Sequence, residues 1–143
     1  MVEFGSMKYN DERKMHLLLD ISGVLIIGNE ANHELIEYLV SSCPIERISL
    51  VTNLDINSGD VLTRRYGIPE FYDEIISAGE TGYAKPNPKI FEEALKRLNA
   101  KAEECIFVDD TEENIEAART LGMKGILYRD FVSFRAELEN LIQ

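Results

Sequence analysis

The sequence predicts an α/β domain in which helices cover both faces of a parallel sheet. Short apolar runs at His16–Leu19, Ile48–Val51 and Cys105–Val108 have the length of buried strands, and the second is rich in β-branched residues. Between these runs, apolar residues recur at helical spacing and the connections are short. We therefore expect residues 1–143 to form one doubly wound, Rossmann-like, three-layer α/β/α domain with about five strands.

The amino-terminal half is predicted to alternate strands and helices. Strand His16–Leu19 is followed by a helix within residues 32–42, where Leu, Ile and Val residues share one face. Strand Ile48–Val51 precedes a less regular helix that ends at Gly67. Ile75 and Ile76 are predicted to form a third strand.

The carboxy-terminal half continues this alternation. Asn87 is predicted to cap a helix that has Pro88 in its first position. Strand Cys105–Val108 precedes a helix capped by Thr111, with acidic residues in its first turn and Gly122 at its end. The last strand contains Ile126 and Leu127, and the last helix contains Phe134, Leu138, Leu141 and Ile142.

Composition excludes several classes of protein. The net charge of −11 makes nucleic acid an unfavourable partner, and no apolar run approaches the roughly 18 residues of a membrane span. Residues 1–13 are polar and mixed, and we expect them to be a tag or a disordered leader. Cys43 and Cys105 lack metal or redox spacing, so we expect two reduced thiols in a cytoplasmic protein.

Polar residues that suit a phosphate and a divalent metal follow three of the predicted strands. Asp20, Thr52 with Asn53, and Asp109 with Asp110 stand at the carboxyl ends of strands, where open α/β sheets bind ligands. A carboxylate at Asp20 can attack phosphorus if a hard cation offsets the repulsion between the two anions. Lys85 adds positive charge where a transferring phosphoryl group gains negative charge.

Each of these residues also has an ordinary structural explanation. An Asp after a strand is commonly a turn or capping residue, and two Asp residues before a helix favour the helix dipole. Thr52 and Asn53 would fit a simple turn, and Lys85 would fit a solvated loop. Their joint occurrence, in this order and on compatible elements, favours the functional interpretation.

Four segments together resemble the haloacid dehalogenase-like hydrolase superfamily, and the resemblance covers the chain from about Lys14 onward. The segments are Asp20-Ile21-Ser22-Gly23-Val24-Leu25, Leu50-Val51-Thr52-Asn53, Gly82 to Phe91 around Lys85-Pro86, and Phe107 to Asn114 with the helix after it. The resemblance implies a Mg²⁺-dependent hydrolase that forms an aspartyl-phosphate.

The resemblance also implies a role for each matching residue. Asp20 would be the nucleophile and a Mg²⁺ ligand, and the backbone carbonyl of Ser22 would be a second ligand. Asp110 would bind the metal, with Asp109 supporting it directly or through water. The remaining residues would hold the phosphate, neutralise its charge or orient the acidic loop; they are Thr52, Asn53, Lys85 and Asn114.

Two departures from the family pattern limit the functional interpretation. Ser22 stands where the family's phosphatases usually carry a general-acid Asp, and the loss of that acid predicts a rate lower by about 10²–10⁴. The Ser-containing loop is similar to that of phospholysine phosphohistidine inorganic pyrophosphate phosphatases and their relatives. The chain also has no room for a cap domain, since 32 positions separate Asp20 from Thr52. We therefore expect an open site in a capless or minimal-cap member.

Three classes of function follow from this interpretation. The first is a phosphohydrolase that acts through Asp20 on a small molecule or on an exposed phosphate of a larger one. The second is a catalytically impaired phosphate-binding or regulatory module, which Ser22 and the missing cap favour. The third is a halide-displacing enzyme, against which Asp109, Asp110 and the open site count. A homo-oligomer would be compatible with each of them.

Overall fold

The computed structural model describes residues 15–56 and 58–143, so the leader expected over residues 1–13 lies outside the described residues. The strands are β1 (His16–Leu19), β2 (Ile26–Ile27), β3 (Glu30–Ala31), β4 (Arg47–Thr52), β5 (Ile75–Ser77), β6 (Cys105–Asp109) and β7 (Lys124–Leu127). The helices are α2 (His33–Ser41), α3 (Asp60–Tyr66), α4 (Ala78–Thr81), α5 (Pro88–Leu98), the 3-10 turn η1 (Ala102–Glu104), α6 (Glu112–Thr120) and α7 (Phe131–Leu141).

Five strands form one parallel sheet, which confirms the predicted fold class. Their order is β5-β4-β1-β6-β7, so β1 lies at the centre and the chain winds outward from it in both directions. Leu17 in β1 is paired with Ile48 in β4 on one side and with Ile106 in β6 on the other. This register brings the carboxyl ends of β1, β4 and β6 to the same edge of the sheet.

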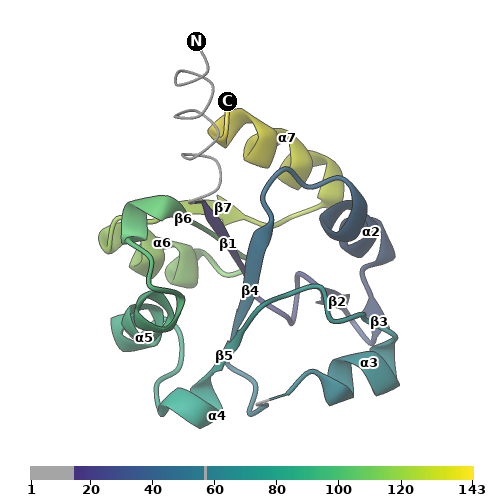
Figure 1. Cartoon of the computed structure of the whole chain (residues 1–143), viewed down its shortest axis with the longest axis horizontal. Helices are drawn as coiled ribbons and strands as arrows, with labels where there is room; N and C mark the ends of the chain where they lie inside the picture. Colours follow the sequence, from purple (N-terminus) through teal and green to yellow (C-terminus); the bar gives the residue numbers. More distant parts are fainter. Residues whose placement is uncertain (1–14, 57) are drawn as a thin grey trace.

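Alternate side chains of the central strands fill two separate cores. Leu17 and Leu19 pack with buried residues of α2, α3 and α7, whereas Leu18 and Phe107 pack with residues of α5 and α6. Figure 1 shows α5 and α6 on one side of the sheet and α2, α3 and α7 on the other. Phe91 of α5 meets Phe107 edge to face, with ring centroids 4.9 Å apart, a favourable aromatic geometry. Helices therefore cover both faces of the sheet.

The helix boundaries largely follow the sequence. The Asn87 side chain accepts a hydrogen bond from the Lys89 N–H at 3.0 Å, which confirms the predicted cap of α5. Thr111 occupies the N-cap position of α6, but its side chain accepts no capping hydrogen bond. Instead, the Thr111 N–H donates to Asp109 Oδ1 at 2.9 Å, so the acidic loop satisfies this end of the helix.

The sequence did not predict the short elements. A hairpin of β2 and β3 follows the Asp20 loop, with two residues in each strand and Gly28 at a φ of +64° between them. Two-residue strands show no alternation of apolar and polar positions, so their sequence carries no strand pattern. Within the described residues, this hairpin and the loop before it make up the whole connection between β1 and α2. None of the described helices combines the length and apolar composition needed to cross a membrane.

Candidate active site

The predicted site residues meet at the carboxyl edge of the sheet. Asp20 directly follows β1, Thr52 ends β4 and Asp109 ends β6. A pocket of about 390 Å³ opens at this edge and is lined by Asp20, Ser22, Gly23, Thr52, Asn53, Leu54, Lys85, Asp110, Thr111 and Asn114. Every residue predicted for the site lines this pocket except Asp109, which is fully buried beside it.

Hydrogen bonds fix the Lys85 ammonium group in the centre of the site. Its Nζ donates hydrogen bonds of 2.8 Å to Asp20 Oδ1, to Asp109 Oδ2 and to the backbone oxygen of Val51. These three bonds use all three ammonium protons, and the side chain is only 1% exposed. Because two carboxylates share the buried charge, a neutral acceptor in place of one would still leave the ammonium three hydrogen bonds and one buried counter-charge.

Asn53 holds the main chain of Lys85 in place. Its Oδ1 accepts the Lys85 N–H at 2.7 Å, and its Nδ2 donates to the Lys85 oxygen at 3.1 Å. The Asn53 side chain thus links the end of β4 to the loop before α5 through two hydrogen bonds. The sequence predicted Asn53 only as a phosphate-binding residue. These two hydrogen bonds join residues 32 positions apart, so no local sequence pattern could have indicated them.

The two oxygens of Asp20 differ in their surroundings. Oδ1 accepts from Lys85 and from the N–H of Ile21 at 2.8 Å, while Oδ2 accepts no hydrogen bond from the described residues. Burial raises the pKa of Asp20 to about 6, opposed by the Lys85 charge and reinforced by Asp109. One oxygen is therefore anchored, and the other is free to bind or attack.

Asp109 accepts three hydrogen bonds. Its Oδ2 accepts from Lys85 and from Asn114 Nδ2, the latter at 3.2 Å, and its Oδ1 accepts from the N–H of Thr111. These contacts fix the carboxylate and, through it, the position of the Lys85 ammonium. Asn114 reaches the acidic loop directly from the first turn of α6.

The carboxylates gather closely enough to share a cation. One oxygen from each of Asp20, Asp109 and Asp110 lies within 4.8 Å of the others. Burial, followed by the neighbouring Asp109, raises the pKa of Asp110. Three carboxylates face one lysine here, and an all-oxygen donor set of this kind fits Mg²⁺. The donor chemistry therefore agrees with the predicted cofactor.

Gly23 lets the Asp20 loop pass close to the acidic loop. Its φ is +88°, and a Cβ at this position would overlap the Asp110 carboxylate. Gly28, in the hairpin, has a φ of +64°, and a Cβ added to it would have no heavy atom within 4 Å. The two glycines thus share a backbone requirement, and only Gly23 also has a steric one.

This difference gives a testable prediction. Gly28→Ala should cost about 1 kcal/mol of stability, because alanine disfavours a positive φ. Gly23→Ala should carry a similar cost and also displace Asp110, so a rise in unfolding temperature on adding Mg²⁺ is expected for Gly28→Ala and not for Gly23→Ala. Thermal unfolding with and without Mg²⁺ measures both effects. An equal Mg²⁺-induced rise in the two variants would contradict the steric role of Gly23.

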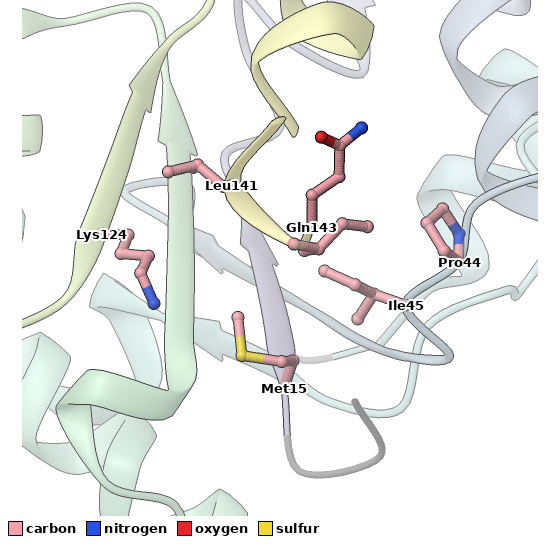
Figure 2. Close-up of a pocket in the computed structure, with 7 residues that line it drawn as sticks. Met15, Pro44, Ile45, Lys124, Leu141 and Gln143 are labelled. Carbon is pink, nitrogen blue, oxygen red and sulfur yellow. The ribbon is translucent and has the colours of Figure 1, made fainter. Parts of the chain in front are cut away.

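A second pocket lies at the opposite end of the sheet and contains none of the predicted site residues. It has a volume of about 180 Å³ and is lined by Met15, Pro44, Ile45, Lys124, Leu141, Ile142 and Gln143. Figure 2 shows the Met15, Ile45 and Leu141 side chains around it, where the start of β1 approaches the end of α7. Its lining contains no Asp or Glu side chain, whereas the predicted site residues gather at the carboxyl edge.

Comparison with known proteins assigns the family. A model described as haloacid dehalogenase-like hydrolase matches residues 45–122, more than half of the 143-residue chain. The chain belongs to this hydrolase family. The matched region contains β4, the Lys85 loop and the acidic loop, which are the segments that carry most of the site. This confirms the resemblance seen in the sequence.

Named relatives of the family match parts of the chain. A glyceraldehyde 3-phosphate phosphatase of Methanothermobacter thermautotrophicus is 39% identical over 83 residues, covering 57% of this chain and 36% of the relative. The bifunctional epoxide hydrolase 2 of Rattus norvegicus is 35% identical over 88 residues, covering 61% and 16%. A sesquiterpene phosphatase of Aspergillus oryzae is 30% identical over 95 residues, covering 66% and 48%. The chain thus spans less than half the length of each of these relatives.

Solved structures share the fold over almost their whole length. A protein from Corynebacterium glutamicum superposes with a TM-score of 0.75 at 23% identity, covering 90% of this chain and 95% of the other. A haloacid dehalogenase family enzyme from Bacteroides thetaiotaomicron, in complex with magnesium and inorganic phosphate, gives a TM-score of 0.70 at 15% identity, with coverages of 84% and 98%. At these identities the likeness establishes the fold alone.

Proposed function

We propose that this protein is a Mg²⁺-dependent phosphohydrolase that acts through a phospho-aspartate on Asp20. The observation that carries the proposal is the asymmetry of the Asp20 carboxylate. Lys85 and the Ile21 N–H hold Oδ1, while Oδ2 has no hydrogen bond among the described residues and Asp20 lines the pocket. A nucleophile needs this combination of a fixed orientation and a free lone pair.

In the proposed reaction, Asp20 Oδ2 attacks phosphorus and forms a new P–O bond. The bond from phosphorus to the substrate oxygen breaks, and that oxygen leaves with the electron pair. Water then attacks the phosphoryl group, which releases inorganic phosphate and restores the carboxylate. The Thr52 hydroxyl accepts the Leu54 N–H at 3.0 Å, so its own proton remains available for a phosphoryl oxygen.

The metal site follows from the acidic cluster. Asp20, Asp110 and the Ser22 backbone carbonyl would hold Mg²⁺, with Asp109 supporting it directly or through water. When bound, Mg²⁺ would neutralise charge between the carboxylates and the phosphoryl oxygens. Lys85 supplies the fixed positive charge that the chain itself contributes.

Two relatives support phosphate chemistry by name, the glyceraldehyde 3-phosphate phosphatase and the sesquiterpene phosphatase.

The second candidate function is a phosphate-binding or regulatory module with little turnover. Ser22 favours this alternative, because it lines the pocket in place of an acid that could protonate the leaving oxygen. A halide-displacing enzyme is disfavoured because its reaction requires no metal, whereas three carboxylates gather here.

The deciding experiment measures release of inorganic phosphate from p-nitrophenyl phosphate and acetyl phosphate, with Mg²⁺ and after chelation. Phosphate release that requires Mg²⁺ is expected on both substrates, and acetyl phosphate should be preferred because its leaving group needs little protonation. If the protein binds Mg²⁺, as shown by a raised unfolding temperature, yet releases no phosphate from either compound, the binding module becomes the better description.

A further inference from the structure

The pocket around Asp20 contains very little positive charge. Lys85 is the one cationic side chain among the described residues that line it, and its three protons are committed to Asp20, Asp109 and Val51. Asp20 and Asp110 also line the pocket, and the charge of the proposed Mg²⁺ would be shared between these carboxylates and the transferred phosphoryl group. Lys85 and the proposed Mg²⁺ would balance the charge of the one phosphoryl group that is transferred. No described lining residue offers a further positive charge to a second anionic group of the substrate.

Lys89, the next basic residue after Lys85 in the sequence, lies outside the pocket lining. It lies in the first turn of α5, and its Nζ is 5.2 Å from the centre of the Tyr83 ring. The whole chain carries a net charge of −11, so its long-range field also opposes a multiply charged ligand.

The wall that follows the phosphate-binding pair is apolar. Leu54 lines the pocket, is 40% exposed, and comes directly after Thr52 and Asn53. The bond from its N–H to Thr52 Oγ1 fixes its main chain relative to the hydroxyl predicted to hold phosphate. An apolar side chain anchored this close to the phosphate is suited to contact the part of the substrate attached to it.

We infer that the site selects monophosphates whose remaining part is uncharged and contacts Leu54, and that it discriminates against substrates with a second anionic group. This inference rests on the proposed phosphohydrolase function. It places substrate selection in Leu54 and in the charge of the pocket.

Two isosteric substrates test the inference. The compounds 4-(2-carbamoylethyl)phenyl phosphate and 4-(2-carboxyethyl)phenyl phosphate differ in one terminal group, which is a neutral amide in the first and a carboxylate in the second, and two methylene groups separate it from the ring, so the leaving phenols are equally basic. At 0.15 M salt with Mg²⁺, kcat/KM should be about five- to tenfold higher for the amide, the size expected for one unpaired anion in a partly hydrated pocket. The corresponding phosphonates, which cannot be hydrolysed, should show the same order of affinity by calorimetry.

Two variants with the same change of charge show whether the preference for the amide substrate depends on the position of Leu54. Leu54→Lys should bring the ratio of the two substrates close to one, because it supplies the missing cation. Val61→Lys is the control, since Val61 is 43% exposed in α3 and does not line the pocket, and this variant should keep the wild-type ratio.

A wild-type ratio within twofold of one, for substrates and phosphonates alike, would overturn the inference. An equal change in both lysine variants would do the same, because it would show a general charge effect. Absence of phosphate release from every substrate, acetyl phosphate included, would count against the hydrolase function, and the affinities of the two phosphonates would then decide the inference alone.

Discussion

Asp20→Asn should lower the rate of phosphate release by a factor of about 10⁴ or more, since losses of this size accompany removal of a catalytic nucleophile. The asparagine oxygen can still accept hydrogen bonds from Lys85 and Ile21, so the fold and the pocket should persist. What the variant loses is the negatively charged oxygen that attacks phosphorus. Phosphate release in the presence of Mg²⁺ is the measurement.

The same substitution should stabilise the metal-free protein at neutral pH. The pKa of Asp20 is raised from 3.8 to about 6 in the folded state, chiefly by burial. A raised pKa means that folding favours the protonated carboxyl. The stability that this group contributes is therefore present below pH 4 and is lost as the pH rises through 6. Asparagine stays neutral, so its advantage should grow over this window to between about 1 and 3 kcal/mol.

Thermal unfolding of both proteins in a chelating buffer at pH 4.5 and pH 8 measures this advantage. Asp73→Asn is the control, because it removes the same charge from an exposed residue outside the pocket and should retain phosphate release. Undiminished turnover in Asp20→Asn would exclude Asp20 as the nucleophile. A stability difference that shrinks with rising pH would contradict the raised pKa.

The sheet, and the position of Asp20, Thr52 and Asp109 at its carboxyl edge, could be predicted because both depend on local patterns. Apolar runs mark β1, β4 and β6, and the first polar residue after each run lies at the carboxyl edge once the strands are parallel. Asp20 and Thr52 come together for this reason alone. No knowledge of side-chain contacts was needed to place them in one pocket.

The hydrogen bonds that hold the site and its loops together could not be predicted, because they join residues far apart in the chain. Asn32, predicted only within a helix, caps α2 and donates to the Val24 oxygen at 2.9 Å and to the Tyr128 hydroxyl at 2.8 Å. This links the loop after Asp20 to the end of β7, across 96 positions of sequence between Asn32 and Tyr128. Such bonds depend on the distances that the completed fold sets.

Ser22→Asp should raise kcat/KM for an alkyl phosphate such as glycerol 2-phosphate by about 10²–10⁴, the usual contribution of a positioned general acid. Ser22 is exposed and lines the pocket, so a larger polar side chain can be accommodated without burial. The alkoxide that leaves from this ester is strongly basic and needs a proton as it departs. Acetyl phosphate releases a weakly basic carboxylate, so its gain should be less than about tenfold.

Ser22→Asn separates acid catalysis from shape, because asparagine closely matches aspartate in size and has no acidic proton to give. If a missing acid limits the wild-type protein, the aspartate variant alone should accelerate the alkyl ester. Equal rates in both variants would show that Ser22 does not limit turnover. An aspartate variant that stays inert while binding Mg²⁺ would instead place the deficiency elsewhere in the pocket and favour the phosphate-binding module. The pair of variants therefore distinguishes a phosphatase restricted by its leaving group from a protein that binds phosphate without hydrolysing it.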